Sequence, residues 1–144
     1  MLVLIILATV SMASLHANAM SDEDKSRVTM AVERTLTDQK AIESAWVRIG
    51  GWNNDMNLTV LLAEGSDVIS VAVPITVIYV TLVKQYPDFG NLNVTYKTEK
   101  GIIDSAYGLR SWAEQVKEEG KSYNKDDLVN FGGAMMLTLD SLTR

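Results

Sequence analysis

Four short segments of the chain have the pattern of β-strands and predict two β-hairpins, and apolar and polar side chains alternate most clearly in the second and third of them. The four segments are residues 41–49, 56–64, 92–97 and 102–109. Residues 56–64 show the pattern most clearly, because Leu58, Val60 and Leu62 fall on one side of the strand and Asn57 and Thr59 on the other. Gly- and Asn-rich connections, GGWNND in the first pair and TEKG in the second, provide the turns. In the last segment Ile103, Tyr107 and Leu109 are expected to share one face.

Apolar residues spaced three and four apart predict helices in the rest of the chain. The first covers residues 21–40, with Ser21 and Asp24 as its capping pair. Ser111 and Glu114 predict a capping box for a short helix that ends before Gly120. Asn124 is expected to cap a last helix, inside which the Gly132-Gly133 pair indicates close approach of another element.

The segment SDVISVAVPITVIYVTLVKQY, residues 66–86, has an ambiguous pattern. It is rich in β-branched residues and has Pro74 in its middle, but its apolar residues also fit one broad helical face. We expect helix over 75–86, whereas 67–73 fits either a strand or a helix. The segment has no charge between Asp67 and Lys84, yet it is short and interrupted for a membrane span, so it is assigned to a buried helix across the sheet.

These elements predict an α+β fold, in the order helix, hairpin, helix, hairpin, helix and helix. The expected architecture is a mainly antiparallel four-stranded sheet with helices packed on one face.

Residues 1–19 predict a cleaved signal peptide. The stretch 1–15 has no charged side chain and is too short to span a bilayer, and Ala17-Asn18-Ala19 follows the A-x-A pattern of a cleavage site. A basic residue at the start, typical of such leaders, is missing, so an uncleaved anchor or a buried helix is the alternative. Cleavage leaves residues 20–144 as one α+β domain, periplasmic or secreted and without stable membrane insertion, and the absence of cysteine favours a bacterial origin.

Composition narrows the chemistry that this domain can perform. The chain has 13 basic and 18 acidic residues, a net charge of −5, which disfavours binding to nucleic acid. It has no cysteine, and its single histidine, His16, lies in the predicted leader. Ser-His and Cys-His nucleophiles and the usual zinc, haem and iron–sulfur sites therefore need residues that the mature domain lacks. We expect neither a metal nor a cofactor.

Adjacent carboxylates occur at residues 22–24, 118–119 and 126–127, near the ends of expected helices. Neighbouring helix positions point about 100° apart, so solvated or capping roles explain these residues better than a shared-proton pair. Turn chemistry likewise explains the oxygen-rich WNNDMN sequence better than calcium binding does.

The first hairpin carries the candidate binding residues Trp46, Arg48, Trp52 and Asn54. Trp46 has the opposite parity to Ala45 and Val47, and Trp52 lies in the turn, where it either folds back onto the core or forms a recognition surface.

Two functions remain for this sequence. The first is a small exported, non-catalytic binding or protein-interaction module, whose partner is another protein or a small ligand. The alternative is a hydrolase that depends on carboxylates rather than on histidine or cysteine.

Overall fold

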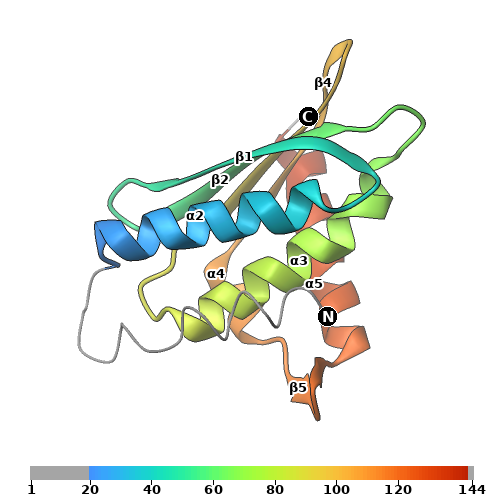
Figure 1. Ribbon diagram of the computed structural model, residues 1–144. Helices are drawn as coiled ribbons and strands as arrows, with labels where there is room; N and C mark the ends of the chain where they lie inside the picture. Colours follow the sequence, from blue (N-terminus) through green and yellow to red (C-terminus); the bar gives the residue numbers. More distant parts are fainter. Residues whose placement is uncertain (1–19, 143–144) are drawn as a thin grey trace.

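The computed structural model describes residues 20–142, so the predicted leader lies outside the described residues. The fold is α+β: helices pack against a four-stranded sheet, and in Figure 1 they lie on the same side of it. The elements follow in the order α2 (Asp22–Thr37), β1 (Ile42–Gly50), β2 (Asp55–Leu62), α3 (Val68–Gln85), β3 (Leu92–Thr98), β4 (Gly101–Gly108), α4 (Arg110–Glu114), β5 (Glu118–Glu119), β6 (Ser122–Tyr123) and α5 (Lys125–Leu142).

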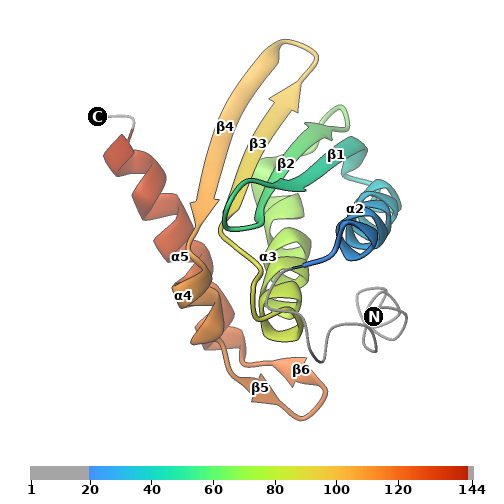
Figure 2. The same cartoon turned by 90° about the vertical axis from the view of Figure 1, so that its left-hand side faces the viewer.

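The four-stranded sheet is mixed, so the prediction of a mainly antiparallel sheet is wrong. Its strands follow the order β1-β2-β3-β4, and each hairpin is an antiparallel pair. The central pair, β2 and β3, is parallel, with Leu58 opposite Val94. The physical reason is the crossover through α3, which returns the chain to the end of the sheet where β2 began. Figure 2 shows the four strands side by side with α3 beside the central pair.

Helix α2 begins as its sequence predicts and covers the β1 edge of the sheet. The Ser21 hydroxyl accepts a hydrogen bond from the Asp24 backbone N–H at 3.1 Å. Val28, Val32 and Leu36 form its buried stripe. On the strand side, the Glu33 carboxylate accepts a hydrogen bond at 2.9 Å from the backbone N–H of Val47 in β1. This contact satisfies an amide that an edge strand otherwise leaves unpaired.

Helix α3 is one continuous helix across the whole of residues 68–85, including the stretch that the sequence left open. Asp67 caps it by accepting a hydrogen bond from the Ser70 N–H at 2.9 Å. Pro74 lies inside the helix, and its missing N–H leaves the preceding turn without one ladder bond. By length and composition α3 could cross a membrane, but half of it is buried inside the protein. This burial agrees with the expected role of α3 as a helix packed across the sheet.

The core lies between the inner face of the sheet and the helices. Alternate residues of β2 and β3, among them Leu58, Val60 and Val94, point into it. Tyr79 of α3 is fully buried there, with its ring stacked 5.9 Å from that of Phe131 in α5. Burial raises the pKa of Tyr79 well above its usual value, so this phenol stays protonated and donates its hydrogen bond at physiological pH.

Strand β4 presents small residues to the core, and its larger residues Ile103 and Tyr107 are not among the buried ones. Ala106 and Gly108 are the buried positions, while Ile103 is exposed and Tyr107 half-buried. The reason is α5, whose Phe131 packs directly over Gly108: a Cβ at Gly108 would lie 3.2 Å from the Phe131 ring. The bulk at this edge of the core is thus supplied by the helix and not by the strand.

The region between β4 and α5 differs from its prediction. Helix α4 ends at Glu114, and its N-cap is Leu109, whose apolar side chain cannot accept a hydrogen bond. Glu114 instead forms an ion pair at 2.7 Å with Arg110, so the expected capping box with Ser111 does not form. The remaining residues form the small β5–β6 hairpin, with Glu118 opposite Tyr123. As predicted, Asn124 caps α5, accepting from the Asp127 N–H at 3.0 Å.

Candidate functional site

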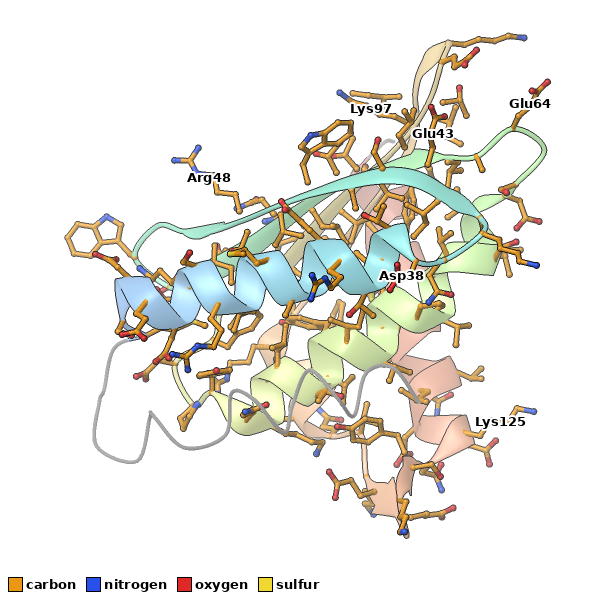
Figure 3. The ribbon with its side chains drawn as sticks, viewed as in Figure 1. Asp38, Glu43, Arg48, Glu64, Lys97 and Lys125 are labelled. Atoms are coloured by element: carbon orange, nitrogen blue, oxygen red, sulfur yellow. The ribbon has the colours of Figure 1, made fainter. Side chains whose placement is uncertain are left out.

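Trp46 and Arg48 lie together on the outer face of the sheet, the face turned away from the helices. Trp46 is 54% exposed and pairs with Thr59 across the hairpin, and Arg48 pairs with Asn57. Figure 3 shows the Arg48 side chain pointing away from the helices. The opposite parity of Trp46 is therefore confirmed, and these two predicted residues share one surface.

Trp52 does not fold back onto the core, because its side chain is fully exposed at the tip of the first hairpin. It borders a polar hollow of about 440 Å³. The floor of this hollow is the loop before β3, where Arg110 donates a hydrogen bond to the Phe89 carbonyl at 2.7 Å. The hollow is shallow and lies at one end of the sheet, beyond the outer-face pair.

Asn54 is buried beneath the same turn, where it lines the hollow that Trp52 borders and lies away from Trp46 and Arg48. It has φ +54°, a left-handed conformation that asparagine tolerates better than most residues. Its side-chain amide donates to the Asp88 carbonyl at 3.1 Å, and its own carbonyl accepts from the Gly90 N–H at 3.0 Å. A Cβ at Gly90 would lie only 2.2 Å from the Asn53 carbonyl. The loop that contains Gly90 therefore packs against the turn too closely for any side chain at position 90. Asn54 thus holds the turn in place.

A second candidate site, which the sequence does not predict, is an apolar groove between α3 and α5. We call it the α3–α5 groove; it encloses about 280 Å³. Its walls and floor are formed by Val68, Ile69, Ala72, Val73, Thr76, Val77, Tyr96, Asp104, Ser105, Ala106, Lys125, Leu128, Val129, Gly132 and Met135. Three aliphatic side chains of the walls are largely exposed: Ile69 by 71%, Val73 by 64% and Val129 by 63%. Contiguous exposed apolar surface of this kind is typical of interaction sites.

The floor of the α3–α5 groove contains a free hydroxyl group. Tyr96 of β3 is only 2% exposed, and its hydroxyl has no hydrogen-bond partner among the residues that the structure describes. Burial, with a smaller contribution from the Asp104 carboxylate, raises the pKa of Tyr96, so the hydroxyl keeps its proton and can donate. The Tyr96 oxygen is not among the fully buried atoms that lack a partner, so it keeps contact with solvent and can pair with an occupant of the groove instead.

Gly132 leaves space in the α5 wall of the groove. A Cβ at Gly132 would meet nothing within 4 Å, and the same is true of Gly133. The close approach that this glycine pair suggested is therefore not found. Each glycine costs the helix about 1 kcal/mol relative to alanine. No contact within the described part of the chain explains why residue 132 is a glycine rather than a larger residue.

The signal that could have revealed the groove is the presence of apolar residues in α3 outside its one broad apolar face. Residues 78–83 are all buried, although they span more than one helical turn. Ile69 and Val73, in the first half of the helix, are exposed. The sequence shows these additional apolar residues, but only the structure shows that they are left uncovered.

Carboxylates offer little to the hydrolase alternative. Asp22 and Glu23 are exposed in the first turn of α2, and Glu118 and Glu119 are exposed in β5. Among the described residues, no group of three histidine, cysteine, aspartate or glutamate side chains could hold a metal ion.

One hollow, of about 560 Å³ beside α4, does contain two carboxylates, Glu114 and Asp127. Glu114 is ion-paired with Arg110, and Asp127 accepts from the Lys117 N–H at 3.1 Å. Both carboxylates in this hollow therefore already have partners within the protein.

Comparison of this chain with models of known protein families, with curated proteins and with solved structures finds no match.

Tyr79 and Tyr96, two of the three tyrosines buried in the described core, should respond differently to removal of the hydroxyl group. Tyr79 donates to the Gly90 carbonyl at 2.8 Å, so Tyr79→Phe should lower the free energy of unfolding by about 1–2 kcal/mol. Tyr96→Phe breaks no hydrogen bond, and its effect should stay within about 0.5 kcal/mol. Urea unfolding of both variants measures the difference. Equal losses would show that the Tyr96 hydroxyl has a partner inside the protein.

Proposed function

We propose that this protein is a small exported, non-catalytic binding module that takes its partner or ligand in the α3–α5 groove. The observation that carries the proposal is the groove itself: an apolar cavity whose walls expose three aliphatic side chains and whose floor holds an unpaired hydroxyl. Binding sites are commonly apolar clefts with a few polar groups that fix orientation.

The alternative surface is the first hairpin, where Trp46 and Arg48 share the outer sheet face and Trp52 stands free at the tip. Exposed tryptophan and arginine are frequent contributors to binding energy. The α3–α5 groove is favoured because it is concave and encloses apolar volume, whereas the hairpin residues lie on an open surface.

Export is supported by residues 1–19, whose apolar run and A-x-A ending fit a leader that directs the chain to the periplasm or the medium. Native mass spectrometry of the protein from the envelope fraction of its host should find a chain that has lost about 19 residues, as the signal-peptide pattern implies. A mass that includes residues 1–19 would instead make the stretch an anchor or part of the fold.

An uncharged apolar dye, Nile red, tests binding in the α3–α5 groove. The full chain should bind it, and Gly132→Leu should weaken binding about tenfold by filling the groove, since a Cβ at this position meets nothing within 4 Å. Gly133→Leu is the matched control: it adds the same side chain one position along, outside the groove lining, and should leave binding unchanged. Fluorescence titration measures all three proteins.

Two further measurements make the Nile red result interpretable. Both leucine variants should unfold at equal or higher urea concentration than the parent, because each removes a helical glycine. Trp52→Ala reports on the hairpin: loss of dye binding in this variant but not in Gly132→Leu would move the binding site to the hairpin and contradict the proposal.

A further inference from the structure

The α3–α5 groove is bounded in a way that could accommodate one more helix. Its two walls are helices, and its floor is formed by residues of β3 and β4, among them Tyr96 and Ala106. The α3 wall runs from Val68 to Val77, roughly 14 Å at the usual helical rise, which is between two and three turns. A helix laid between α3 and α5 would cover Ile69, Val73 and Val129 at once.

The volume of the groove fits anchor side chains better than a complete ligand. At about 280 Å³ it lies at the lower end of the usual size of a small-molecule pocket, roughly 300–1,000 Å³. A helix that docks in a groove buries only the side chains of one face, typically at positions i, i+3, i+4 and i+7. The empty space beside Gly132 offers room for one such side chain on the α5 wall.

The charged residues around the groove favour one sign of charge on the bound partner. Asp104 lines the floor of the groove, and two further carboxylates neighbour lining residues in the chain: Asp67 precedes Val68 and caps α3, and the exposed Asp126 follows Lys125 in the first turn of α5. Hydrogen bonds from Ser70 lower the pKa of Asp67, so this carboxyl is charged at neutral pH. The one cationic side chain in the lining is Lys125, which Figure 3 shows pointing away from the body of the protein. The chain as a whole carries a net charge of −5.

From these features we propose that the α3–α5 groove binds an amphipathic helix of a partner protein, with aliphatic side chains on one face and lysine or arginine beside them. The aliphatic face packs on Ile69, Val73 and Val129, one anchor enters the space at Gly132, and the Tyr96 hydroxyl donates a hydrogen bond to a polar group of the partner. The basic side chains pair with the carboxylates in and beside the groove and fix the orientation of the helix. This inference rests on the proposed function, because it names the partner of the same groove.

Two synthetic peptides of about 14 residues, enough for the length of the groove, test the inference. Both carry leucine at positions i, i+3, i+4 and i+7; one has lysine at the remaining positions and the other has glutamate. Fluorescence anisotropy should show the leucine–lysine peptide binding to the full chain and to Gly133→Leu alike, with about tenfold weaker binding to Gly132→Leu. Asp104→Asn should weaken binding of the same peptide, and the leucine–glutamate peptide should bind at least about tenfold more weakly than its basic counterpart.

Each alternative occupant of the groove predicts a different result. Equal binding of the basic peptide to Gly132→Leu, or equal binding of the two peptides, would overturn the inference. Displacement of Nile red by the short-chain lipid dihexanoyl phosphatidylcholine, without binding of the basic peptide, would assign the groove to an acyl chain. A dimer in analytical ultracentrifugation that Gly132→Leu dissociates would assign the groove to a second copy of this chain.

The Nile red titration separates the two proposals. If the dye binds in a Gly132-dependent way while neither peptide does, the groove is a binding site for a different occupant, and only the basic helix is excluded. If neither dye nor peptide distinguishes Gly132→Leu from Gly133→Leu, the binding function of the groove fails as well.

Discussion

The largely apolar composition of α3 is the constraint on which the rest of this structure depends. A helix without a charged residue from position 68 to 83 must be covered around its whole circumference or leave apolar surface in water. The protein achieves this cover over residues 78–83, which are all buried. It does not achieve it over the first half, where Ile69 and Val73 are exposed. The α3–α5 groove is the consequence of this incomplete cover.

The same helix determines the topology of the sheet. It connects β2 to β3, and the crossover makes these central strands parallel while each hairpin stays antiparallel. Tyr79 then ties α3 to the rest of the fold, because its hydroxyl donates to the Gly90 carbonyl in the loop that precedes β3. That loop in turn seats on the first hairpin through the Gly90–Asn54 backbone hydrogen bond. Asn54 of the hairpin turn is consequently tied to the core through this loop, whereas the side chain of Trp52 in the same turn is fully exposed.

Local patterns in the sequence predicted the elements better than their arrangement. Strand-like patterns located all four strands, and the side chains of Ser21 and Asn124 cap their helices because a cap depends on residues a few positions apart. The direction of β3 and the core face of β4 depend on distant partners. Gly108 faces the core since Phe131 of α5 occupies the space above it, and no pattern within residues 101–108 contains that information. Among the candidate site residues, parity placed Trp46 correctly, whereas the buried role of Asn54 required the loop around Gly90. The groove was missed for the same reason: exposure of Ile69 and Val73 depends on where α5 lies.

The measurement that tests this account most directly is an amide NMR titration of the ¹⁵N-labelled full chain with the leucine–lysine peptide. If the groove is the binding site, the largest shifts will fall on the first half of α3, on the Tyr96–Asp104 region of the sheet and on α5 around Val129 and Gly132, and they will saturate together. Shifts that centre on Trp46, Arg48 and Trp52, or a spectrum that does not change, would contradict it.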